Sequence, residues 1–389
     1  MAIEPTTSPQ NTSTARSGWA PVGALATGIA LLVASEFLPA SVLPAMAADL
    51  GVSEGTAGLA VAATAIAGAV TAPSIAALLP RADRRRVLVA LLAAGSVANL
   101  AVAVAPSFAV LLAGRLVLGI AIAGYWSFAF GAGRQAVPGR DGLVSAALAF
   151  GVSIATVVAV PVASLVSDEI GWRAAFAGAA ALGALSAVTV AAAVPPVPAH
   201  PAAGLAMLRR ALRNRRLVTG VVCIVLVAFG NFAAYPFIRL AIDRVDPAST
   251  AWLLLVWGVA GMAGNVVAGT LAQRLRPAAA AAPALIAVGL LLTATATSLP
   301  LLAAGVVLWG FGFNMVPVAT QLWVTRAEPE HAESALSLQV TAFQVAITLG
   351  AALGGALVDA RGVGTALVAG TVFAAAGAIG FGLLRVPRA

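Results

Sequence analysis

Long apolar runs, separated by short stretches rich in glycine, proline and arginine, dominate the pattern of hydrophobic and polar positions along the chain. Each run is about as long as the roughly 20 residues that a helix needs to cross a bilayer. None alternates apolar and polar residues in the way of membrane β-barrel strands. The pattern predicts an all-α membrane protein with twelve transmembrane helices, at residues 19–46, 55–79, 86–105, 107–133, 141–166, 173–194, 217–239, 249–272, 278–298, 300–325, 334–358 and 364–384.

The longest polar interruption divides these helices into two sets of six. It begins with a cluster of prolines and ends in the basic stretch RRALRNRR. No short apolar region with a cleavage site precedes the first long run, so we expect no cleaved signal peptide. The predicted domains are a disordered cytoplasmic tail at 1–18, an N-terminal six-helix bundle at 19–194, a cytoplasmic linker at 195–216 and a C-terminal six-helix bundle at 217–385.

The two sets of helices resemble each other when one is shifted by 191 residues, which indicates an internal repeat. The shift carries Asp168 onto Asp359 and Gly171 onto Gly362. Small residues match easily by chance in an alanine-rich chain, so the aspartate and the shared order of elements are the better evidence. Two facing, pseudo-symmetric six-helix bundles around a central cavity are typical of secondary transporters.

Composition supports this assignment and excludes several other classes. Only 9% of the residues are charged and 61% are hydrophobic, with a mean hydropathy of +1.01. A soluble protein carries about 25% charged residues, so a nuclease or a disordered scaffold is excluded. The single cysteine, Cys223, excludes a disulfide framework.

The net charge of +8 indicates membrane orientation rather than nucleic-acid binding. The arginines lie in short loops between apolar runs and form no single basic patch. If the N-terminus is inside, seventeen of the 22 arginines fall on the cytoplasmic side, four fall outside and one lies within a span. This bias predicts that both termini are cytoplasmic.

Glu36 is the acidic residue placed deep in a predicted span. Such a group costs at least about 2.5–3.5 kcal/mol in a bilayer, so a functional role is the default expectation, although a structural ion pair or a glutamate that snorkels to the surface is the alternative. At the helical rise, Glu36 lies about 26 Å from Trp19 at the cytoplasmic end of the first span, and Arg115 lies about 29 Å from Arg134 at the cytoplasmic end of the fourth, so the two have nearly the same depth. Arg115 is therefore a candidate counter-charge. Burial and a guanidinium act in opposite directions on the protonation of a carboxyl group, as a proton-coupled site needs.

Polar and aromatic side chains in the spans are candidates for binding a planar polar substrate. Asn231 and Tyr235 share one helix face, and Ser337, Thr341, Gln344 and Thr348 form a stripe with helical spacing. The alternative is that hydroxyl groups bond to their own helix and aromatic rings fill gaps. The full candidate set is Tyr125, Trp126, Asn231, Tyr235, Asn314, Gln321, Thr341 and Gln344.

A third set of residues is a candidate for conformational change. Small residues at a spacing of four let helices approach closely, and proline bends a span, although plain helix packing gives the same pattern. Asp83 could cap or pair with a helix end, or its loop could simply fix topology. The set is Asp83, Arg84, Arg86, Pro161, Gly350 and Gly354.

An enzyme is not expected. His200 and His331 lie in predicted loops without the spacing of metal ligands, and no phosphate-binding loop is present. We therefore expect no metal and no cofactor.

Several short motifs carry a family resemblance from about Trp19 to Arg385. They are SEFLP at 35–39, DRRR at 83–86, GRLVLG at 114–119, GWR at 171–173 and GAALGG at 350–355. With them, the chain resembles the major facilitator superfamily in its drug:proton antiporter branch. The stretches EFLP, ADRR, GYW and WVTR are most similar to those of purine ribonucleoside efflux pumps, with sugar and chloramphenicol efflux pumps close.

The resemblance implies export of small molecules driven by inward proton flow, with alternating access by rocking of the two bundles. Glu36 and Arg115 occupy the positions of the family's acidic coupling residue and span-four arginine. Ala159 and Ala163 stand where the branch commonly has glycine. We expect a monomer in the bacterial inner membrane whose partners are protons, a small-molecule substrate and lipid, with no nucleic acid. A proton-independent facilitator or importer, and a non-transporting membrane sensor, remain the alternatives.

Overall fold

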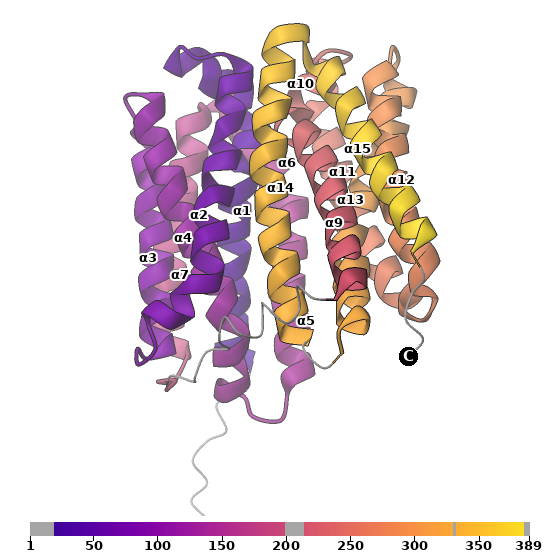
Figure 1. The fold of residues 1–389 in the computed structure, drawn as a ribbon. Coiled ribbons are helices and arrows are strands. Elements are labelled where there is room, and N and C mark those ends of the chain that lie inside the picture. The colour runs from indigo at the N-terminus through magenta and orange to yellow at the C-terminus, as the bar shows by residue number, and fades with distance from the viewer. Residues whose placement is uncertain (1–18, 199–213, 330–331, 385–389) are drawn as a thin grey trace, which may run out of the picture.

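The computed structural model describes residues 19–198, 214–329 and 332–384, and this part of the chain is almost wholly helical (Figure 1). Within it, twelve helical segments are long and apolar enough to cross a membrane, which confirms the prediction of twelve spans. The predicted tail at 1–18 and residues 199–213 of the predicted linker lie outside the described residues.

The N-terminal half supplies the first six spans. Its fifth span is one continuous rod made of α5, a π-helical turn η1 and α6. The elements are α1 (Trp19–Leu50), α2 (Glu54–Leu78), α3 (Arg84–Ala103), α4 (Phe108–Ala136), α5 (Asp141–Ile154), η1 (Ala155–Ala159), α6 (Val160–Glu169) and α7 (Trp172–Ala193).

The C-terminal half supplies the other six spans. Its first span is interrupted by a 3₁₀ turn between α9 and α10. The elements are α9 (Arg215–Ala234), η2 (Tyr235–Phe237), α10 (Ile238–Asp243), η3 (Pro247–Ser249), α11 (Thr250–Thr270), η4 (Leu271–Arg274), α12 (Leu275–Thr295), α13 (Leu299–Ala327), α14 (Ala332–Arg361) and α15 (Val363–Leu383).

Proline accounts for both irregular spans. Proline has no N–H and cannot continue the helical hydrogen-bond ladder. Pro161 follows the π-helical turn directly, and Pro236 lies within the 3₁₀ turn of the seventh span. The second interruption places Tyr235 at the point where the helix changes its winding. Next to Pro161, where a bend was predicted, the fifth span has a π-helical turn. Such turns often occur at functional sites.

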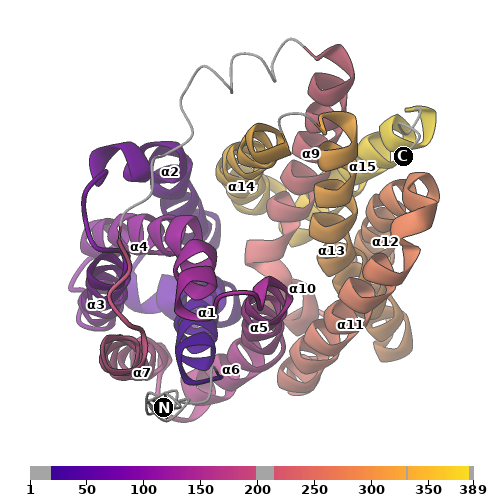
Figure 2. The ribbon, with the colours of Figure 1, turned by 90° about the horizontal axis from the view of Figure 1, so that it is seen from below.

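The two halves form two bundles that face each other (Figure 2). Two seams join them: α14 packs along α2, and α11 packs against η1 and α6. Close approach depends on glycine, because a methyl group on Gly258 would overlap Thr156 and Val157, and one on Gly355 would overlap Gly55. Gly350 and Gly354, in contrast, pack against α9 of their own half.

The two ends of the molecule differ in their polar contacts between halves. We call the end that carries residues 80–83 and 195–198 the linker end, and the end that carries 51–53 and 170–171 the far end (top in Figure 1). All inter-half hydrogen bonds between described residues lie at the far end. Two of them join Asp359 to the start of α2, where Ser53 Oγ and Gly55 N donate to its carboxylate at 2.6 and 2.9 Å. The far end is therefore closed.

Candidate substrate and coupling site

Arg115 is fully buried in the N-terminal half, where its side chain supplies a hydrogen bond that the α1 main chain lacks. Pro39 has no N–H, so the carbonyl of Ser35, four residues earlier, lacks its helical donor. Arg115 Nη1 donates to Ser35 O at 2.7 Å and Nη2 to Glu36 O at 2.8 Å, while Nε donates to Ala60 O at 2.9 Å. One guanidinium thus joins α1, α2 and α4.

The Glu36 side chain is half-buried on α1, next in the chain to Phe37, whose ring meets Tyr235 of the other half. Its charge interacts electrostatically with Arg115 of its own half and with Tyr235 of the other half. Between described residues its carboxyl group makes no ion pair or hydrogen bond, since Arg115 contacts Glu36 through the main-chain carbonyl. The coupling role of both residues stays a prediction.

Opposite Glu36, the C-terminal half presents a group of stacked rings that we call the aromatic wall: Tyr235, Trp257 and Phe313. The Tyr235 and Phe313 rings stack at 5.9 Å with an interplanar angle of 9°, and Trp257 lies 5.3 Å from Phe313 at 29°. Phe37, next to Glu36, meets Tyr235 edge-on at 5.3 Å. The wall therefore meets α1 at Phe37, the residue that follows Glu36.

Several polar groups around the aromatic wall are buried without a partner among the described residues. They are Tyr235 OH, Trp257 Nε1, Asn231 Nδ2 and Asn314 Nδ2. Asn231 is held in place because its Oδ1 accepts from Trp309 Nε1 at 2.8 Å. Buried polar groups are nearly always hydrogen-bonded, so four unpartnered donors in one place need an explanation. A ligand rich in hydrogen-bond acceptors would satisfy them.

Sequence reasoning identified Asn231, Tyr235 and Asn314 but missed Trp257 and Phe313. Both lie in uniformly apolar spans, α11 and α13, and nothing in a single sequence distinguishes a wall-forming ring from a packing ring. Asn99, which donates to Ser35 Oγ at 2.8 Å, was also missed. An asparagine within an apolar span was the available signal.

Other predicted substrate residues lie elsewhere. Tyr125 is buried inside the N-terminal half, where its hydroxyl donates to Leu25 O at 3.1 Å, as the gap-filling alternative expects. Trp126 and Gln321 are exposed. Binding roles for these three residues stay predictions.

The predicted polar stripe on α14 reaches the seam between α14 and α2. Gln344 is half-buried, and its amide lies against Gly68 of α2 in the other half. Thr341 is also half-buried, and Thr348 donates to Gln344 O of its own helix at 2.9 Å. The side chain of Ser337 lies outside the described residues.

The DRRR motif at 83–86, which follows the second span, lies at the linker end and makes contacts there. Asp83 caps α3 by accepting from Arg86 N at 3.0 Å, and it also accepts from Val197 N at 2.9 Å. Arg84 is buried, donates to Leu79 O at 2.7 Å and lies over a phenylalanine ring, whereas the Arg86 side chain is exposed. The cap predicted for Asp83 is therefore present, and its role in a conformational change stays a prediction.

Twelve spans in two facing halves, with a polar and aromatic site between them, define a membrane transporter rather than an enzyme. The family model of the Major Facilitator Superfamily matches residues 25–332 and 220–389. The chain belongs to this superfamily, and it is a multi-pass membrane transporter.

Curated relatives agree with this assignment, and a solved structure agrees with the fold. The chain is 34% identical over 361 residues to the purine ribonucleoside efflux pump NepI of Shigella sonnei (strain Ss046), covering 91% of each chain. It is 35% identical to the pump of the same name from Escherichia coli (strain K12), with the same coverage. An inward-facing, unoccupied bacterial homolog of the human lysosomal transporter Spinster superposes with a TM-score of 0.73 at 16% identity, covering 96% of this chain and 98% of that one.

Proposed function

We propose that the protein exports purine ribonucleosides across the bacterial inner membrane in exchange for protons. The proposal rests on one observation above all: four buried donors without partners lie on or near stacked aromatic rings, which meet α1 at Phe37, the residue next to Glu36. A purine offers a flat face for stacking and several ring acceptors, and a ribose adds further oxygens. Relatives named as purine ribonucleoside efflux pumps support the substrate class.

Glu36 is the proposed proton carrier. Burial and the Arg115 guanidinium act in opposite directions on the protonation of its carboxyl group, so a change of water access changes proton occupancy. Glu36 precedes Phe37, whose ring meets Tyr235 of the other half, so a rearrangement of the halves changes the surroundings of both the proton carrier and the proposed substrate site. Arg115, held by three main-chain carbonyls, is the fixed charge of the pair.

The orientation follows from the arginine bias along the chain. We place the linker end and both termini in the cytoplasm, so that the closed far end faces outside. The structure then corresponds to a state whose substrate site is shut off from the exterior by the contacts of the far end.

Everted vesicles test the proposal. A proton gradient should accelerate uptake of a radiolabelled purine ribonucleoside, and uridine or glucose in excess should compete poorly. Glu36→Gln should abolish this acceleration but retain nucleoside exchange without a gradient, because only the proton carrier is lost. Glu169→Gln, which removes an exposed carboxylate at the far end, is the matched control.

Each alternative has its own outcome. Undiminished gradient-driven uptake by Glu36→Gln would remove the coupling role. Wild-type exchange that ignores the gradient would indicate a facilitator, and effective competition by glucose would overturn the purine assignment.

A further inference from the structure

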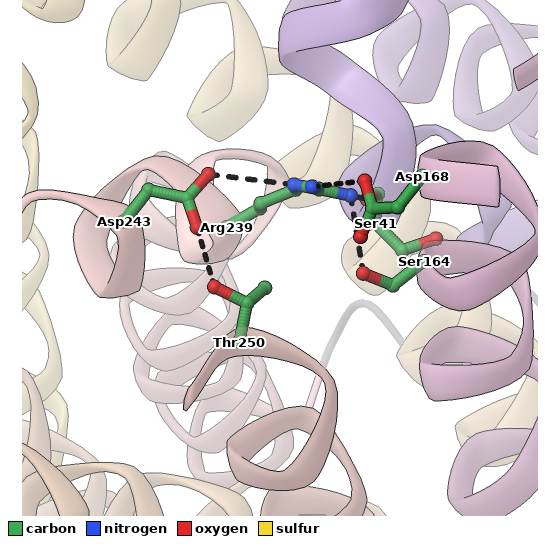
Figure 3. A network of polar contacts seen from close by, with 6 residues as sticks. All are labelled: Ser41, Ser164, Asp168, Arg239, Asp243 and Thr250. Carbon is green, nitrogen blue, oxygen red and sulfur yellow. Dashed lines mark hydrogen bonds and ion pairs between the residues drawn. The ribbon is translucent and has the colours of Figure 1, made fainter. Parts of the chain in front are cut away.

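Arg239, at the far end, makes contacts with both halves of the molecule (Figure 3). It lies in α10, and its side chain is only 13% exposed. Nη2 donates to Asp168 Oδ1 at 2.6 Å, and Nη1 donates to Ser41 O at 2.9 Å and to Ser164 Oγ at 3.1 Å. Three contacts of one guanidinium therefore cross from the C-terminal half to α1 and α6.

The same guanidinium has a weaker contact within its own half. Arg239 Nε lies 3.4 Å from Asp243 Oδ2, one helical turn further along α10. Thr250, at the start of α11, donates to the other oxygen of Asp243 and holds that carboxylate in place. Figure 3 shows Arg239 extended between the two aspartates.

These two aspartates respond differently when the far end opens. Asp168 belongs to the other half, so separation of the halves breaks its bond to Arg239. Asp243 moves with Arg239 because both lie on α10, so this contact survives and can shorten from 3.4 Å. A charge-assisted hydrogen bond strengthens steeply as it shortens toward about 2.8 Å.

We propose that Asp168 and Asp243 compete for Arg239 and thereby set the balance between the closed and open far end. Asp168 favours the closed state, and Asp243 favours the open state because it keeps the released arginine paired. Arg239 is a positioning residue for the transport cycle, since it acts through the arrangement of the halves. The proposal needs only alternating access, so it holds or fails independently of the substrate and of proton coupling.

The central prediction is that neutralising the two aspartates moves the far end in opposite directions. Asp168→Asn should raise the ratio of open to closed molecules by about five- to tenfold, the range expected for a partly exposed ion pair whose arginine is also held by Ser41 and Ser164. Adding Asp243→Asn should bring this ratio back toward the wild-type value, because the open state loses its own partner for Arg239. Ser164→Ala should open the far end in the same direction as Asp168→Asn, but less.

Spin-label distances in the full chain, reconstituted in lipid nanodiscs, measure this ratio. Cys223→Ala removes the only cysteine, so labels can be placed at Ser107 and Thr297, exposed far-end positions in opposite halves. Asp49→Asn is the matched control, because it breaks the 2.9 Å ion pair with Arg173 at the same end but within one half.

The competition is overturned if adding Asp243→Asn to the Asp168→Asn variant opens the far end further. It is also overturned if this addition leaves the distances of the Asp168→Asn variant unchanged. It is also overturned if Asp49→Asn shifts the distances as much as Asp168→Asn, since any lost charge would then have the same effect.

Discussion

The two halves bring opposite kinds of polar group to the centre of the molecule. In the N-terminal half, Arg115 is buried and its guanidinium donates to three main-chain carbonyls, one of which Pro39 leaves without a helical donor. In the C-terminal half, Tyr235 and Trp257 are equally buried, yet their donors have no partner among the described residues. Burial of polar groups alone does not indicate binding. The three contacts of Arg115 belong to the fold, whereas we propose that the unpartnered donors of Tyr235 and Trp257 bind the substrate.

Arg115→Leu tests the comparison with the largest expected effect, a loss of stability. The substitution leaves the carbonyls of Ser35 and Ala60 without this donor, and an unsatisfied buried group costs about 1–3 kcal/mol. We expect a drop of about 5–10 °C in the melting temperature of the purified protein. Arg173→Leu, which removes a partly exposed arginine at the far end, should cost less. A melting temperature within 2 °C of wild type for Arg115→Leu would show that these contacts are dispensable.

Tyr235→Phe tests the other half with a smaller change. Its hydroxyl has no partner to lose in the structure, so the melting temperature should stay constant or rise slightly. Nucleoside affinity should fall about tenfold, because the hydroxyl is then missing from the bound complex. KM for vesicle uptake and thermal unfolding measure the two effects. A loss of stability without a change in KM would place Tyr235 with the structural groups.

Tyr125→Phe is expected to have the smallest effect of the three substitutions, and it refines the comparison. The Tyr125 hydroxyl donates to Leu25 O within the N-terminal half, so its removal should cost about 1 kcal/mol of stability. KM should stay within about twofold of wild type, which is the reverse of the pattern expected for Tyr235. A tenfold rise in KM would return Tyr125 to the substrate site predicted from the sequence.

The spans could be predicted because membrane crossing imposes a length and a composition that each apolar run meets by itself. The repeat also placed Asp168 and Asp359 correctly in relation to each other. Both lie at the far end, and each accepts hydrogen bonds from the other half. Such features follow from local pattern and from order along the chain.

Contacts between distant positions could not be predicted. Equal depth suggested a pairing of the Arg115 and Glu36 side chains, whereas Arg115 donates to the main chain of Glu36. Nothing in the sequence indicates the contacts of Arg239, because its bonds to residues about 70 and 200 positions away leave no trace in the sequence pattern. Depth and side of the membrane are properties of one helix, whereas partners depend on how helices are rotated against each other.

The π-helical turn η1 gives the fifth span a means of such rotation. A π turn holds one residue more than the α-helical turn it replaces, and each residue turns an α-helix by about 100°. Conversion of η1 to α-helix would therefore twist α6 by about that angle relative to α5 and swing Asp168 away from Arg239. The turn packs against Gly258 of α11, which belongs to the other half. A change of winding at mid-depth would therefore alter both this contact and the position of Asp168 at the far end.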